Sequence, residues 1–313
     1  MKPPPTTNIK YSDISSAIKA FHNGENIMNF IKERLSLNNN SSNIIELSYD
    51  LQAGAYIENI RAIAEKHDRY TTEISHIFQE FSGKYESILD IGTGEMTTLT
   101  SILNKIEHTP EKTFAFDISW SRIAKGINYI KQNLKKETSL HAFVGDINAI
   151  PLHTNSVSVI TSNHALEPNG NNLKNLLSEL FRVAKDILIL FEPCYEINSD
   201  KGKKRMDKLG YIKNIDQTIS SAGGTLIEKI KIKNTHNPLN PTMCFIIKPP
   251  ETHFKRPNQD SIYSLPGTDF SLEKMDNFYF SNDAGLSFPI LKEIPILRES
   301  SAILSTSLIK PQH

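Results

Sequence analysis

Short apolar runs alternate with helix-length amphipathic segments through the middle of the chain, from about residue 85 to residue 249. This alternation is typical of repeated β-α units around a mostly parallel sheet with helices on both faces, an α/β fold. The last two apolar runs are too close for an intervening helix and are expected to pair as an antiparallel hairpin. Seven strands are predicted, at residues 87–90, 113–116, 141–144, 157–162, 187–191, 225–232 and 243–247.

Amphipathic segments between these runs predict four helices. Ser119 and Asn172 are expected to be N-caps, because their side chains accept hydrogen bonds from the first turn of a helix. The predicted helices cover residues 97–106, 119–133, 173–184 and 202–222.

The segments before residue 85 and after residue 249 have different patterns of apolar and polar residues. From Ser12 to about Phe81, apolar residues recur at helix spacing, with a polar break at residues 38–42, which predicts two or three helices. After residue 250 the chain is polar with scattered aromatic residues, which predicts a small β-rich unit. The expected parts are 1–84 (N-terminal helical extension), 85–250 (α/β core) and 251–313 (β-rich C-terminal unit).

Charge and cysteine content narrow the classes of partner. Lys plus Arg and Asp plus Glu both number 35, so no global positive field attracts nucleic acid or an anionic membrane, and neither is an expected partner. Cys194 and Cys244 are too few for a disulfide framework and lack metal-site spacing. No apolar run has the length of a membrane span, and residues 1–10 are polar and proline-rich, unlike a signal peptide. These features predict a cytoplasmic protein.

A strand that runs into a glycine turn and then a helix, at Ile88–Thr98, is the strongest local motif. Gly92 and Gly94 let the backbone approach a ligand, although an ordinary βα turn carries such glycines too. Asp90, before the first glycine, suits the ammonium of an amino-acid ligand, whereas a dinucleotide pyrophosphate requires a bare helix N-terminus. The motif therefore favours S-adenosylmethionine over NAD.

Two more acidic residues follow the next two predicted strands. Asp117 comes 117 − 94 = 23 residues after Gly94, near the roughly 20-residue separation at which an acid reaches a ribose diol. Asp146 ends the third strand, where a carboxylate can accept the adenine amino group while Ile147 packs beside the ring. The alternatives are a helix N-cap for Asp117 and a turn aspartate for Asp146.

These three motifs, in this order, resemble those of the class I S-adenosylmethionine-dependent methyltransferases, over about half of the chain. The resemblance implies a Rossmann-like core, S-adenosylmethionine as cofactor, S-adenosylhomocysteine (SAH) as product, and an N-terminal extension that covers the cofactor as a lid. Two positions depart from the family pattern: Met96 stands where many members have a third glycine, and Ser158 where an aspartate often begins the fourth strand. The cofactor-binding residues that the resemblance implies are Asp90, Gly92, Gly94, Asp117, Ile118, Asp146, Ile147 and Asn163.

The segments after the fourth and fifth strands are expected at the same edge of the sheet, where open α/β folds bind ligands. His164 is the candidate general base and Glu167 the group that orients an acceptor. The alternative is that Asn163 and His164 only line the cofactor pocket and that Glu167 caps a turn. The candidate substrate-binding residues are Tyr49, Tyr56, Glu192 and Tyr195.

The C-terminal segment 276–297 resembles the small zinc-ribbon-like activator domains of RNA and protein methyltransferases. Residues 256–259 stand in place of the first cysteine pair and Phe280 near the second, so no metal is expected. The unit is expected to pack on the core through Phe278, Tyr279, Phe280 and Phe288. Whether it shapes the substrate pocket, forms a homodimer interface or only stabilises the core stays open.

The sequence therefore predicts an enzyme that transfers a methyl group from S-adenosylmethionine to an oxygen or nitrogen of a small-molecule metabolite, such as a sugar, a lipid precursor or a secondary-metabolite intermediate. One alternative is an RNA or protein methyltransferase, which the C-terminal segment suggests. The other is a non-catalytic binding protein that keeps the methyltransferase fold.

Overall fold

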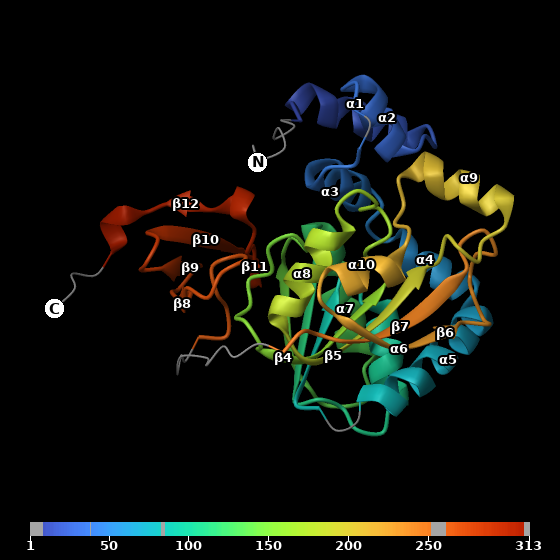
Figure 1. Ribbon diagram of the computed structural model, residues 1–313. Helices are drawn as coiled ribbons and strands as arrows, with labels where there is room; N and C mark the ends of the chain where they lie inside the picture. The colour runs from blue at the N-terminus through green and yellow to red at the C-terminus, as the bar shows by residue number, and fades with distance from the viewer. Residues whose placement is uncertain (1–8, 38, 83–84, 252–260, 310–313) are drawn as a thin grey trace.

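A computed structural model of the chain describes residues 9–37, 39–82, 85–251 and 261–309. Its centre is a seven-stranded sheet in the order β3-β2-β1-β4-β5-β7-β6 (Figure 1). Within this sheet β7 runs antiparallel to both of its neighbours, and the other pairs are parallel. The predicted strands and the closing hairpin are confirmed. Their bounds are β1 Ser87–Ile91, β2 Lys112–Asp117, β3 Ser139–Val144, β4 Val157–Asn163, β5 Ala184–Pro193, β6 Thr225–Lys231 and β7 Thr242–Lys248.

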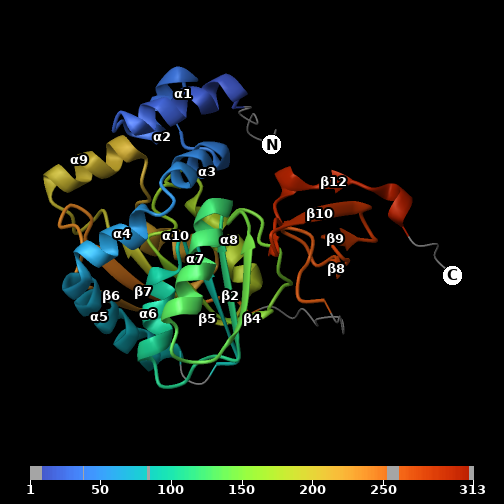
Figure 2. The same ribbon diagram turned by 180° about the vertical axis from the view of Figure 1, so that it is seen from behind.

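Helices cover both faces of the sheet (Figures 1 and 2). One face buries apolar side chains of α5, α6 and α7, among them Ile74, Leu103 and Ile123. The other face buries those of α8 and α10, among them Leu177 and Ile219. This arrangement confirms the Rossmann-like α/β core. The bounds are α5 Ala64–Ser82, α6 Thr97–Lys105, α7 Trp120–Asn133, α8 Leu173–Val183 and α10 Ile215–Ser221.

The prediction of one helix over residues 202–222 is wrong. The structure has two, α9 Asp200–Leu209 and α10, because Gly210 (φ +69°) ends α9 and Asn214 (φ +53°) precedes α10, both in the left-handed region. Ser119 caps α7 as expected, its hydroxyl accepting from the backbone N–H of Arg122. Asn172 occupies the N-cap position of α8, but its side chain makes no capping hydrogen bond.

The described residues of the N-terminal extension form five helices, where the sequence predicted two or three. Left-handed glycines explain two of the missed breaks: Gly24 follows α1, and Gly54 (φ +103°) is the N-cap of α4. Within the described ranges, no helix is long and apolar enough to cross a membrane. The extension consists of α1 Tyr11–His22, α2 Ile27–Arg34, α3 Ser42–Leu51, α4 Ala55–Ala62 and α5.

The C-terminal unit is a small antiparallel sheet in the order β11-β10-β9-β8, with β12 paired to β10. The β-rich prediction is therefore confirmed. Residues 256–259, the segment compared with a cysteine pair, lie outside the described residues. The strands are β8 Glu273–Lys274, β9 Phe278–Ser281, β10 Leu286–Leu291, β11 Ile294–Pro295 and β12 Ile303–Leu304.

This unit packs against the edge strand β3 and the residues that follow it. Phe288 and Leu297 are fully buried in the same apolar cluster as Phe143 of β3. Ile296 pairs with Val144 in a parallel bridge, and the N–H of Leu297 donates to the carbonyl of Val144 at 2.8 Å. Of the four aromatic side chains expected in this contact, Phe280 and Phe288 are buried, while Phe278 and Tyr279 are partly exposed.

Because Leu297 lies in the main core, its truncation should destabilise the whole protein. We expect Leu297→Ala to lower the free energy of unfolding by about 2–5 kcal/mol, the usual cost of a buried Leu→Ala cavity. Leu304→Ala is the matched control, because Leu304 is 75% exposed. Urea denaturation measures both. An unchanged stability of Leu297→Ala would show that the C-terminal unit is not part of the cooperative fold.

Candidate active site

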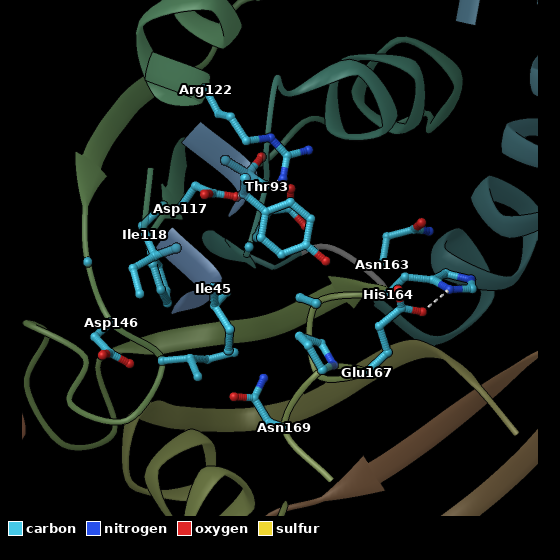
Figure 3. Close-up of a pocket in the computed structure, with 18 of the residues that line it drawn as sticks. Ile45, Thr93, Asp117, Ile118, Arg122, Asp146, Asn163, His164, Glu167 and Asn169 are labelled. Atoms are coloured by element: carbon cyan, nitrogen blue, oxygen red, sulfur yellow. Dashed lines mark hydrogen bonds and ion pairs between the residues drawn. The ribbon is translucent and has the colours of Figure 1, made fainter. Parts of the chain in front are cut away.

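A pocket lies at the carboxyl ends of β1, β2, β3 and β4, beneath α3 and α4 (Figure 3). Most of the residues predicted to bind the cofactor meet there, together with His164 and Glu167. Tyr49 and Tyr56 line it from the N-terminal extension. The predicted residues among its lining are Tyr49, Tyr56, Asp90, Gly92, Asp117, Ile118, Asp146, Ile147, Asn163, His164 and Glu167.

The loop after β1 turns sharply through two left-handed glycines. Gly92 has φ +57° and Gly94 has φ +55°. A Cβ at Gly92 would lie 2.5 Å from Cβ of Ala165, and one at Gly94 would lie 2.4 Å from Nη2 of Arg122. Met96, where a third glycine was noted as missing, also adopts the left-handed conformation, with φ +56°. The loop therefore keeps a backbone that suits glycine, at the cost of local strain at Met96.

Asp117 connects the loops that follow β1 and β2. Its carboxylate accepts a hydrogen bond from the N–H of Gly94 and another from the N–H of Ser119, both at 2.9 Å. Arg122 Nη1 lies 3.8 Å from the same carboxylate. Asp117 thus fixes the glycine loop while its side chain forms part of the pocket wall.

Asp90 is a buried acid beside that loop. Burial, with a smaller effect from Asp117, raises the pKa of Asp90 to about 7. The hydroxyl of Thr93, in the glycine loop, lies close enough to offset part of this shift. A cationic ligand would stabilise the charged form of Asp90.

Asp146 stands on the far side of the pocket, after β3. Its carboxylate accepts hydrogen bonds from the backbone N–H and the side-chain amide of Asn148. Ile147 and Asn148 line the pocket beside it. The loop therefore presents one acidic and one apolar side chain, as the sequence predicted.

His164 lies opposite these acids and has an unusual backbone, with φ +59°. Its Nδ1 is 3.0 Å from Glu167 Oε2, and its Nε2 is 2.8 Å from the Thr242 hydroxyl. Asn240 donates to the same Glu167 oxygen. Burial alone would lower the pKa of His164, but the bound Glu167 carboxylate outweighs it, so the pKa of His164 is raised above its ordinary value. His164 and Glu167 thus form a pair at the pocket wall.

Glu192 and Tyr195 do not reach the pocket, so the structure does not support them as direct substrate contacts. Glu192 is fully buried beneath the 164–167 loop, where it accepts from the Ser162 hydroxyl at 2.7 Å and from the N–H groups of Ala165 and Leu166. The aromatic ring of Tyr195 faces Lys213 instead. The sequence placed Glu192 at the correct edge but could not show that its side chain turns inward.

Asn163, Tyr49 and Tyr56 each contact a side chain of a neighbouring helix. The Asn163 amide donates to the Tyr70 hydroxyl of α5 at 2.7 Å. The rings of Tyr49 and Tyr56 lie 5.0 and 5.2 Å from the Arg122 guanidinium, close enough for cation–π interactions. Arg122 therefore joins the N-terminal extension to the Asp117 loop.

Two further contacts between the N-terminal extension and the core are made by acidic side chains. Glu95, in the glycine loop, accepts from the N–H groups of Gly54 and Ile57 at the start of α4. Asp50, at the end of α3, accepts from the hydroxyls of Ser119 and Ser121 at the start of α7. Sequence reasoning missed Glu95 and Arg122, because a single charged residue in a loop or helix gives no periodic signal.

Residues 88–186, which are 99 of the 313, match the family model described as a methyltransferase domain. One similar solved structure is a complex between the Haloferax volcanii Trm112 methyltransferase activator and a protein assigned as a methyltransferase; it is 15% identical over 64% of this chain and 97% of that one, with a TM-score of 0.51. A second is the magnesium protoporphyrin IX methyltransferase of Synechocystis with bound SAH, 11% identical over 75% of this chain and 98% of that one, with a TM-score of 0.46. No curated protein matches the sequence.

The buried Glu192 should make stability depend on pH. Burial raises the pKa of Glu192 to about 7, above its value in the unfolded chain, so the folded state keeps a proton that the unfolded state loses. Stability should fall as pH rises from about 4.5 to 7. We expect Glu192→Gln to remove this component and to be more stable than the wild type at about pH 8, by at most about 3 kcal/mol.

Urea denaturation of both proteins at about pH 5 and about pH 8 measures this difference. Asp90 is unchanged in the variant, so its own pH dependence cancels in the comparison. A stability difference between the two proteins that stays constant with pH would contradict the assignment.

Proposed function

We propose that this chain, which carries a methyltransferase domain with the class I fold, transfers a methyl group from S-adenosylmethionine to an oxygen or nitrogen of a small-molecule metabolite. One observation carries the proposal. Asp90, Asp117 and Asp146, at the ends of three adjacent parallel strands, enter one pocket whose opposite wall carries the paired His164 and Glu167.

The residues present fit this cofactor. The buried carboxyl of Asp90 suits the ammonium of the methionine portion, and Asp117 reaches the ribose hydroxyls with the lone pairs that its two N–H partners leave free. Asp146 and Ile147 suit the amino group and the ring of adenine. Gly92 and Gly94 let the loop pack closely against Ala165 and Arg122, because a Cβ at either position would collide with these side chains.

S-Adenosylmethionine supplies a methyl group on a positively charged sulfur, which needs no covalent activation by the protein. The protein's part is to align the acceptor and to take its proton. His164 is placed for that step at the pocket wall, where Glu167 holds its Nδ1 and the Thr242 hydroxyl contacts its Nε2. Nε2 takes the acceptor's proton when the ring exchanges its hydrogen bond with Thr242 for one with the acceptor, and Glu167 stabilises the resulting imidazolium.

The partial cover over the pocket supports a small acceptor. Tyr49 and Tyr56 cover it from above, and Glu95 and Asp50 fasten the lid to the core on two sides. A chain such as RNA or a folded protein would require this lid to move away. A cytoplasmic location agrees with this proposal and is itself an expectation from the sequence.

The first test is cofactor binding by calorimetry. We expect the wild type to bind SAH with micromolar affinity and Asp90→Asn to bind it about 10 to 100 times more weakly, because a charge-assisted contact to the ammonium is lost. Asp283→Asn is the control, because Asp283 is exposed in the C-terminal unit. No binding by the folded wild type would leave a non-catalytic protein as the better proposal.

The same titrations carry a pH signature. With its pKa near 7, Asp90 must lose a proton before it can pair with the ammonium. SAH affinity should therefore fall as pH drops below about 7, with about half a proton released per ligand at pH 7. An affinity that does not change between about pH 6 and 8 would contradict the role of Asp90.

The second test separates catalysis from binding, once an acceptor has been found by screening small molecules, tRNA and peptides. We expect His164→Asn to lower kcat by about 10² to 10⁴, the usual contribution of a general base, with SAH affinity little changed. His22→Asn, at the exposed end of α1, is the control.

Glu167→Gln sharpens the assignment of the base. Because the carboxylate of Glu167 raises the pKa of His164, its removal should move the rising limb of the kcat–pH profile to lower pH. Full activity of His164→Asn would show that these residues only line the pocket. Methylation of tRNA or peptide but not of any metabolite would favour the macromolecular alternative.

A further inference from the structure

One arginine of the C-terminal unit reaches the wall of the pocket. Arg298 follows the buried Leu297, and its own side chain is 14% exposed. Its Nη1 lies 2.6 Å from Oε2 of Glu46 in α3 and donates to the carbonyl oxygen of Ile118 at 3.3 Å. Three segments that are far apart in the sequence therefore meet at one guanidinium.

The two partners of Arg298 belong to different elements beside the pocket. Ile118 lines the pocket from the fixed core, directly after Asp117. Glu46 belongs to α3, and its neighbour Ile45 lines the pocket from the lid. A single side chain thus holds the lid helix against the loop that carries Asp117.

The base of Arg298 is well anchored. The preceding residues Ile296 and Leu297 pair with Val144 at the end of β3, and Leu297 is fully buried. Because the backbone at Arg298 is already held, forming these contacts costs only side-chain entropy and no further backbone entropy. The C-terminal unit can therefore act as a fixed support for the lid.

The lid helix depends on such contacts because its apolar face packs elsewhere. Ile44 of α3 belongs to a separate apolar cluster with Ala17, Ala20, Ile27 and Ile31 of α1 and α2, not to the core of the sheet. Figure 1 shows these three helices as a group above the carboxyl edge of the sheet. Polar contacts to the core, including those of Asp50 and Arg298, therefore contribute strongly to the position of α3.

We propose that the C-terminal unit completes the cofactor pocket and that Arg298 is the positioning residue through which it holds α3 over the bound nucleoside. The statement about the nucleoside rests on the proposed function; the statement about the lid does not. The C-terminal unit then helps to shape the pocket in addition to stabilising the core.

Hydrogen–deuterium exchange of the ligand-free full chain tests the lid contact without any cofactor. We expect residues 42–51 to exchange about tenfold faster in Arg298→Gln than in the wild type, because hydrogen bonds to a charged group are lost. Lys274→Gln makes the same change of charge at an exposed position of the same unit and should leave this helix unchanged. Arg298→Lys keeps the charge and should restore part of the protection.

SAH titration then tests the pocket. Arg298→Gln should bind SAH about tenfold more weakly with little change in Tm, and Glu46→Gln should weaken it similarly. The double variant should be no worse than either single one, since both remove the same contact. Unchanged exchange in residues 42–51, or faster exchange with unchanged SAH affinity, would overturn the proposal. A wild type that fails to bind SAH would defeat the proposed function instead, while the exchange result would still decide the lid contact.

Discussion

The carboxylate of Asp117 is the contact on which the geometry of the pocket depends. It receives the N–H groups of Gly94 and Ser119, so it fixes the relative position of the first two βα loops. The Arg122 guanidinium lies beside Asp117 and packs against the rings of Tyr49 and Tyr56 from the N-terminal extension. Because Asp117 is 4% exposed, its charge is stabilised mainly by these donors. Replacing it would alter both loops at once, so its contribution to ligand binding cannot be separated from its structural role.

Two acidic residues in and beneath the pocket are buried, and burying an acid lowers the stability of the fold. Asp90 and Glu192 are both buried with a pKa raised to about 7, and each holds or faces a loop that lines the pocket. A core optimised for stability alone would carry apolar or amide side chains at these positions. Asp90 faces the pocket, so a bound ligand would offset the cost of its burial. Glu192 faces inward and accepts three hydrogen bonds at Oε1, while its Oε2 has no partner among the described residues.

The sequence predicted the sheet well because buried parallel strands such as Ile88–Ile91 are continuous apolar runs, and three acids at their ends are in a recognisable order. It failed where the signal was local backbone conformation: Gly54 precedes α4 and Gly210 ends α9, although the apolar periodicity continues past both. It also could not predict the direction of a side chain, as with Glu192, or a contact between distant segments, as with Arg298. The role of Met96 became clear only from its left-handed φ.

The position of Arg298 also has a consequence for the order in which the protein forms during synthesis. Its partner Glu46 lies 298 − 46 = 252 residues earlier in the chain. Domains generally fold as units, and synthesis proceeds at about 5–20 residues per second, so Glu46 leaves the ribosome well before Arg298 does. On the proposal above, α3 takes its final position over the pocket only after the C-terminal unit, which shares the core through Phe288 and Leu297, has been made.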